Sequence, residues 1–157
     1  MDNKSRREKD VVLAGSLRRI LADEFVLYSK MRIARWNVEG SDFYIKYNLF
    51  RRLYLQSEKA MSKIACQLVY MGNSLPTSPL ELLSMTGLTD EVNEKRDSKA
   101  YNSIILNDIR LIQNSLDRMK NVLGFGLYYW DIGSFIDDLS DMHQDMISML
   151  TEGCAGL

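Results

Sequence analysis

Apolar residues recur along this chain at intervals of three and four, which is the spacing of an amphipathic α-helix and not the alternation of a strand. Stripes of this kind occupy residues 13–31, 45–71, 101–123 and 132–150. Both prolines of the chain lie between the second and third stripes. The pattern therefore predicts an all-α fold with four long helices.

Glycine and short polar residues mark the ends of these helices. Gly40 closes the segment "NVEG" after the first helix, and Ser41 is a candidate cap for the second. Gly72 and Asn73 end the second helix. The loops between the first and second helices, and between the third and fourth, are short, so each pair should form an antiparallel hairpin.

The connection between the second and third helices is much longer and runs over residues 73–97. Within it Ser78, Pro79 and Glu81 have the spacing of a capping box with proline at the first helical position, which predicts a short extra helix. A connection of this length can cross the whole bundle and start the third helix at the same end as the second. One long crossover is typical of the ferritin-like four-helix bundle, which is the predicted fold.

The length of 157 residues fits one domain with a substantial core. The sequence shows no leader pattern and no apolar run long enough to span a membrane, so a cytoplasmic protein without a membrane partner is expected. Cys66 and Cys154 match no metal-binding or redox spacing. They are interpreted as reduced thiols.

Charge is unevenly distributed, although the formal net charge is only −1. Residues 1–10 form a basic N-terminal tail, which precedes one domain at residues 11–157. The cationic side chains of the tail are Lys4, Arg6, Arg7 and Lys9. No lysine or arginine follows Lys120, whereas the last helix is rich in aspartate. The two ends of the chain should therefore face different partners.

Ferritin-like bundles commonly hold a di-iron site built from glutamates and Glu-x-x-His motifs. His143 is the only histidine, and Ser140 stands three positions before it, so the motif is absent. His143 falls on the apolar stripe of the last helix, beside Met142 and Met146. It is expected to be a packed, hydrogen-bonded core residue.

The segments "LADEFVLYSKMRIARWNVEG", "DFYIKYNLFRRLY" and "LPTSPLELLSMTGLTD" resemble the Dps family, the ferritin-like DNA-binding proteins of starved bacteria. The resemblance covers essentially the whole chain after the N-terminal tail. It implies hollow cages of twelve subunits. It also implies an iron-oxidising site between two subunits, one of which contributes two histidines and the other an aspartate and a glutamate.

The positions that match these ligands carry other residues in this chain, namely Arg35, Tyr47, Ser62 and Cys66, which we call the four replaced positions. A guanidinium has no lone pair to donate and stays positive, which opposes Fe²⁺ binding. The hydroxyl groups of Tyr47 and Ser62 coordinate Fe²⁺ poorly while they are protonated. Cys66 is interpreted as a small buried apolar residue and not as a soft-metal ligand. The chain is therefore expected not to be an enzyme, with residual iron oxidation left open.

Aspartates lie opposite the apolar stripe of the last helix, and we call Asp137, Asp138, Asp141 and Asp145 the acidic face. A solvated helix surface explains such a face in a lone bundle. The Dps resemblance implies that the start of this helix lines acidic pores, with Asp131 at the matching position. No cofactor is firmly expected, and iron or another divalent cation at these pores is an open alternative because hard cations prefer carboxylate oxygens.

Proteins of the Dps family often bind DNA through a basic N-terminal extension, which here corresponds to Lys4, Arg6, Arg7 and Lys9. Glu8 and Asp10 weaken a single tail because they can pair with tail cations at helical spacing. Many tails on one cage would act together. Contacts to phosphates would make the binding independent of sequence.

The sequence is thus interpreted as a nucleoid-associated, Dps-like homododecamer that binds DNA and has lost the usual ferroxidase centre. Trp36, Phe43 and Tyr44, with the apolar short helix, exceed what one bundle can cover and favour a closed shell. Two alternatives are an iron-storage cage that takes up iron through acidic pores with a displaced oxidation site, and an oligomerising module with neither activity.

Overall fold

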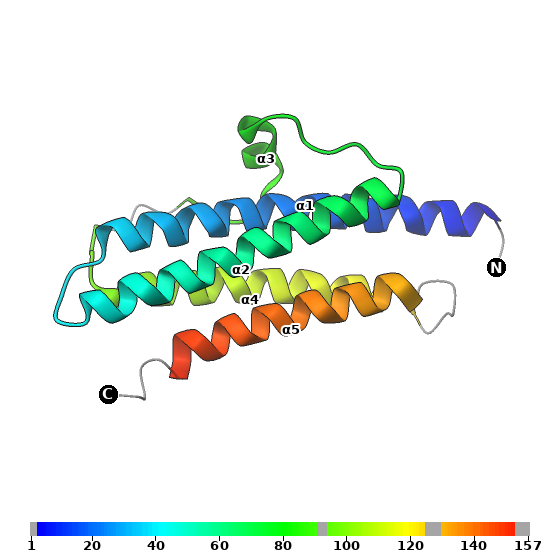
Figure 1. Cartoon of the computed structure of the whole chain (residues 1–157). Helices are drawn as coiled ribbons and strands as arrows, with labels where there is room; N and C mark the ends of the chain where they lie inside the picture. The colour runs from blue at the N-terminus through cyan, green and yellow to red at the C-terminus, as the bar shows by residue number, and fades with distance from the viewer. Residues whose placement is uncertain (1–2, 91–93, 125–129, 153–157) are drawn as a thin grey trace.

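The computed structural model describes residues 3–90, 94–124 and 130–152 (Figure 1). Within these ranges the chain forms helices and no strand. The helices are α1 (Asn3–Asn37), α2 (Phe43–Tyr70), α3 (Pro79–Met85), α4 (Ser98–Leu123) and α5 (Trp130–Glu152). The prediction of an all-α chain with four long helices and a short crossover helix is confirmed.

The long helices form two antiparallel hairpins, α1 with α2 and α4 with α5, which pack side by side (Figure 1). Ser98 at the start of α4 donates a hydrogen bond of 2.6 Å to Asp42, the N-cap of α2. The backbone N–H of Glu39 donates to the carbonyl of Arg96 at 2.9 Å. These contacts place the starts of α2 and α4 at the same end, so the crossover runs along the bundle as the ferritin-like topology requires.

The predicted stripes form the core between the helices. The α4 stripe is buried from Tyr101 to Leu123, and the α5 stripe is buried at Ile136, Leu139 and Met146. The α2 stripe differs from the prediction at its start, because Ile45 is 40% exposed. Its side chain lines an open groove between α2 and α5 and does not reach the core.

The helix caps confirm one prediction and correct another. Ser78 Oγ accepts from the backbone N–H of Glu81 at 3.1 Å, as the capping motif of α3 predicts. The predicted cap of α2, Ser41, is wrong, since Asp42 occupies that position. Asp42 makes no side-chain cap bond, and its carboxylate accepts from Ser98 instead.

Buried polar contacts fix the crossover and α4 against α1. Asp23 on α1 accepts from Thr86 Oγ1 and from the backbone N–H of Gly87, both at 2.7 Å. Lys30, further along α1, pairs with Asp108 of α4 at 2.8 Å. The crossover is thus attached to the bundle by specific hydrogen bonds as well as by apolar packing.

The basic N-terminal tail is helical over its described residues, because α1 begins at Asn3 and projects beyond α2 (Figure 1). The first buried residue of α1 is Leu13. The tail therefore continues the helix without adding a buried residue to the core. None of the described helices is long and apolar enough to cross a lipid bilayer.

Candidate functional site

A polar network lies inside the bundle and joins three helices. Its members are Glu24 on α1, Ser57 on α2 and His143 on α5, each with 0% exposure, and we call them the core polar network. The Glu24 carboxylate binds Nε2 of His143 and accepts from Ser57 Oγ. Nδ1 of His143 donates to the Leu139 carbonyl at 2.6 Å. Both ring nitrogens are therefore occupied, and the prediction of a hydrogen-bonded core histidine is confirmed.

The protonation state of His143 follows from these neighbours. Burial lowers its pKa, but the negative charge of Glu24, the hydrogen bond to Glu24 and the Leu139 carbonyl outweigh burial and raise the pKa above its ordinary value. The doubly protonated ring can donate from both nitrogens at once. The raised pKa favours a buried ion pair, and in either protonation state both ring nitrogens have partners and none is left for a metal.

The first two of the four replaced positions lie in contact. Arg35 is in the last turn of α1, and the short loop brings it over Tyr47 near the start of α2. The guanidinium carbon of Arg35 lies 3.9 Å from the ring centre of Tyr47, which is a cation–π contact. The pair occupies the place that the resemblance assigns to two histidine ligands.

The other two replaced positions, Ser62 and Cys66, lie further along α2 and are exposed. Ser62 Oγ donates to the Glu58 carbonyl at 3.1 Å, which is an ordinary bond within the helix. The interpretation of Cys66 as a buried apolar residue is wrong for the single chain, because it lies off the buried side of α2 that Ile64 and Leu68 form. Cys154 lies outside the described residues.

A second arginine, Arg32, extends the contact between Arg35 and Tyr47 into a cluster. Its guanidinium carbon lies 5.6 Å from the ring centre of Tyr28 and 5.0 Å from that of Tyr54. Arg32 Nη1 donates to the Tyr28 hydroxyl at 2.7 Å, and this bond raises the pKa of Arg32 further. We call these residues, Tyr28, Arg32, Arg35, Tyr47 and Tyr54, the arginine cluster. The sequence offered one signal for Arg32, its spacing of four from Tyr28.

The acidic face is exposed along α5, as predicted. Asp131 lies in the first turn of α5, also as predicted. Asp137 pairs with Lys120 of α4 at 2.5 Å. In the part of the chain that the structure describes, no three His, Cys, Asp or Glu residues are grouped so that they could hold a metal ion.

The basic residues of the tail lie on the first turns of α1. Lys4, Arg6 and Arg7 are exposed, and Lys9 is half-buried. Arg7 also lines a hollow of about 870 Å³ together with Asp10 and Asp131. The basic start of α1 therefore lies beside the acidic start of α5.

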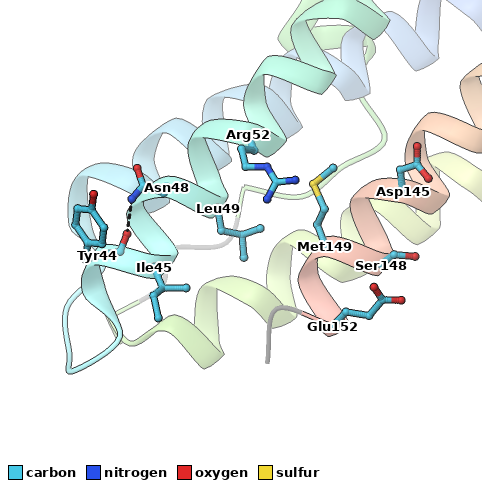
Figure 2. Close-up of a pocket in the computed structure, with 9 residues that line it drawn as sticks. All are labelled: Tyr44, Ile45, Asn48, Leu49, Arg52, Asp145, Ser148, Met149 and Glu152. Carbon is cyan, nitrogen blue, oxygen red and sulfur yellow. Dashed lines mark hydrogen bonds between the residues drawn. The ribbon is translucent and has the colours of Figure 1, made fainter. Parts of the chain in front are cut away.

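An open groove of about 630 Å³ separates α2 from α5 at the opposite end of these helices (Figure 2). Arg52 lies on the α2 side, and Asp145 and Glu152 lie on the α5 side (Figure 2). No ion pair among the described residues joins Arg52 to either acid. Leu49 and Met149 give the groove an apolar lining between these charges.

Comparison with known proteins gives a sequence similarity that covers part of the chain. No protein-family model matches the sequence. Antigen TyF1 of Treponema pallidum subsp. pertenue is 32% identical over 83 residues, which are 53% of this chain and 47% of that protein. The DNA protection during starvation protein of Helicobacter pylori strain J99 is 24% identical over 105 residues, 67% of this chain and 73% of that protein. The chain spans about half the length of the first curated relatives that it matches.

Similarity to solved structures extends over nearly the whole chain. Dps from Thermosynechococcus elongatus has a TM-score of 0.86 at 15% identity, over 96% of this chain and 94% of that chain. A dodecameric thioferritin from Bacteroides fragilis has a TM-score of 0.84 at 12% identity, over 93% of this chain and 86% of that chain. These likenesses show the fold. The partial sequence similarity to a DNA protection during starvation protein agrees with them, and the chain has a Dps/ferritin-like fold.

Proposed function

We propose that the chain assembles into a closed shell of twelve copies that binds DNA without sequence preference in the cytoplasm, at the nucleoid. The shell would lack the usual iron-oxidising centre between subunits. A relative is called a DNA protection during starvation protein, and a structure of the same fold is described as dodecameric. The observation that carries the DNA-binding proposal is that a Dps-type bundle presents the exposed cations Lys4, Arg6 and Arg7 on a projecting helix.

Exposed apolar side chains support the assembly. Trp36, Tyr44 and Leu80 are 64%, 75% and 76% exposed in the single chain. Contiguous apolar patches mark surfaces that associate, and burial of these side chains against neighbouring subunits would supply such contacts. Ultracentrifugation at micromolar concentration should give a particle of twelve subunits, and a monomer or simple dimer would contradict the shell.

The DNA contact is tested by removing residues 1–10. Burial in α1 begins at Leu13, so the truncated chain should assemble normally and lose most of its DNA gel shift. A full-length variant with Gln at Lys4, Arg6, Arg7 and Lys9 should lose nearly as much, because charge and not length carries the contact. The affinity of the natural chain should fall with salt, with a log–log slope of about −0.9 per phosphate neutralised.

A matched control removes four cations elsewhere, all of them exposed, by Gln at Arg51, Lys59, Lys63 and Arg110. This control should bind DNA more tightly than the tail variant at equal salt. An intact truncated shell that binds DNA as tightly as the full chain would place the contact elsewhere. The next candidates are then Arg18, Arg19, Lys95, Arg96 and Lys99.

The absence of fast iron oxidation is a separate part of the proposal. With a guanidinium and a phenol at the first two replaced positions, Fe²⁺ should oxidise at nearly the uncatalysed rate. Restoring the implied ligands by R35H, Y47H, S62D and C66E together should increase that rate. A fast, saturable oxidation by the natural chain would show that iron uses other ligands.

The exposed acidic face favours iron storage as a second candidate function, because carboxylates attract hard cations. Under this alternative, oxidation of Fe²⁺ by air in the presence of the protein should leave iron that co-sediments with the shell. Neutralising Asp137, Asp138 and Asp141 to Asn should then reduce the loading. Iron retention no greater than that of a non-assembled control protein would exclude storage.

A further inference from the structure

The arginine cluster holds two cations beside each other without a neutralising carboxylate. Arg32 and Arg35 are three residues apart and are therefore neighbours on the surface of α1. Their guanidinium carbons lie 5.0 Å and 5.9 Å from the same ring centre, that of Tyr54. Glu58 on α2 acts on Arg32 through its charge, but neither arginine forms an ion pair with a described residue.

Arg35 also lacks hydrogen-bond acceptors. Its Nε is buried and has no partner among the described residues, although buried N–H groups are normally bonded. Tyr47 covers the face of the guanidinium, whereas the N–H groups point outward from its edge, in its plane. In the cluster, aromatic rings therefore cover the flat faces of the guanidinium groups, whereas N–H donors of Arg35 have no hydrogen-bond acceptor.

We propose that the arginine cluster binds a small oxyanion, represented by inorganic phosphate, between Arg32 and Arg35. Guanidinium groups bind phosphate through paired N–H donors, and stacking on aromatic rings holds their planes in position. An anion would also relieve the repulsion between two like charges at this spacing. The site is the electrostatic inverse of an iron site, since it attracts anions and repels Fe²⁺. It is argued from contacts within one chain and does not use DNA binding by the tail.

Titration of the full chain with inorganic phosphate, followed by calorimetry in a low-salt, phosphate-free buffer, tests the site. The natural chain should show saturable binding, and Arg35→Gln should weaken it at least tenfold. Arg110→Gln is the matched control, because it removes one exposed arginine from α4 and should bind as the natural chain does. Absence of saturable binding by the natural chain, or an equal loss in Arg110→Gln, would overturn the site.

A conservative variant separates the site from a general effect of charge or folding. Arg35→Lys keeps the positive charge but loses the planar fork of donors. It should fold normally by circular dichroism and still bind phosphate more weakly than the natural chain. Unchanged phosphate affinity in a folded Arg35→Lys chain would rule out recognition by the guanidinium.

The phosphate group could also come from a DNA backbone, and a gel shift distinguishes the two sources. If a free anion is the ligand, Arg35→Gln should shift a short duplex as the natural chain does. The tail variant with Gln at Lys4, Arg6, Arg7 and Lys9 should lose the shift and keep phosphate binding. A DNA shift lost in Arg35→Gln with phosphate binding unchanged would refute a free-anion site and assign the cluster to DNA.

Discussion

The core polar network and the arginine cluster handle charge in opposite ways. Glu24 and His143 are fully buried, and each neutralises the other while Ser57 and the Leu139 carbonyl satisfy their remaining groups. Arg32 and Arg35 lie at the edge of the bundle among aromatic rings, and no described carboxylate pairs with them. The first region has every charge compensated within the chain, and the second has two that are not.

The difference indicates which region serves the fold and which is available to a partner. A buried ion pair that is complete within the chain has no group left for an outside ligand, and it ties the helices together because breaking one side of it is costly. Arg35 contacts only rings, so its N–H donors have no acceptor within the described chain and can bind a group from outside. An arginine at the position that the resemblance assigns to a histidine ligand would therefore make this surface attract anions where a metal site attracts cations, within a bundle that keeps the ferritin-like fold.

The largest expected effect comes from breaking the core polar network on one side. His143→Leu leaves the Glu24 carboxylate buried without its partner, which should reduce the free energy of unfolding by about 3–5 kcal/mol. Urea denaturation at pH 7 and fixed protein concentration measures this loss. The His143→Leu variant should remain folded only if the free energy of unfolding of the natural chain exceeds that loss.

The double variant Glu24→Met with His143→Leu is the matched control. Removing both partners leaves no unpaired charge, and Ser57 Oγ can keep its bond of 3.2 Å to the backbone carbonyl at position 24. Apolar replacement of a buried pair is often neutral, so the double variant should recover most of the lost stability. A double variant as unstable as the single one would show that the loss in His143→Leu does not come from an unpaired buried carboxylate.

A smaller effect is expected at Asp23, a buried carboxylate that is compensated by neutral donors. Asp23→Ala removes the acceptor of Thr86 Oγ1 and of the Gly87 N–H, which should lower the free energy of unfolding by about 1.5–3 kcal/mol. Amide hydrogen exchange should accelerate at Gly87. Asp23→Asn keeps one oxygen acceptor and should lose less, and equal losses in the two variants would contradict this role.

The pH dependence of stability should be smaller again and has a definite sign. The folded-state pKa of His143 is raised, so its contribution is complete below the unfolded-state pKa of about 6.5 and declines as pH rises through the raised pKa. For one proton the slope is at most about 1.4 kcal/mol per pH unit. Urea unfolding from pH 6 to 9 should show the free energy of unfolding of the natural chain falling relative to that of the double variant, and a relative stability that grows with pH would reverse the assignment.

Most of the fold was predictable because its signals are local. The α4 stripe from Tyr101 to Leu123 and the motif from Ser78 to Glu81 each lie within a few turns of one helix. Ser41 and Ile45 were misassigned because their surroundings depend on contacts with α4 and α5, as the Asp42 bond to Ser98 and the α2–α5 groove show. The positions of Ser41 and Ile45 therefore depend on segments that are distant in the sequence.

The candidate site was predictable only in part for the same reason. The replaced positions followed from resemblance, but the contact of Arg35 with Tyr47 depends on how the α1–α2 loop orients two helices. Glu24 carried a readable signal, since it stands on the apolar stripe of α1 between Ile20 and Met31. A carboxylate on one stripe and His143 on another could have predicted their pairing, whereas Ser57 had no such signal.

The smallest expected effect is on the stability of the chain when Arg35 is changed. Arg35→Gln removes a partly exposed cation–π contact, typically about 0.5–1 kcal/mol, and also relieves the repulsion from Arg32. Without phosphate its thermal midpoint should therefore lie close to that of the natural chain. At a phosphate concentration of about 100 times Kd, a ligand that binds only the folded state adds about 2.7 kcal/mol, so the natural chain should become clearly more stable and Arg35→Gln should not. A large loss in Arg35→Gln without phosphate would mean that Arg35, like Glu24, already has its partner within the fold.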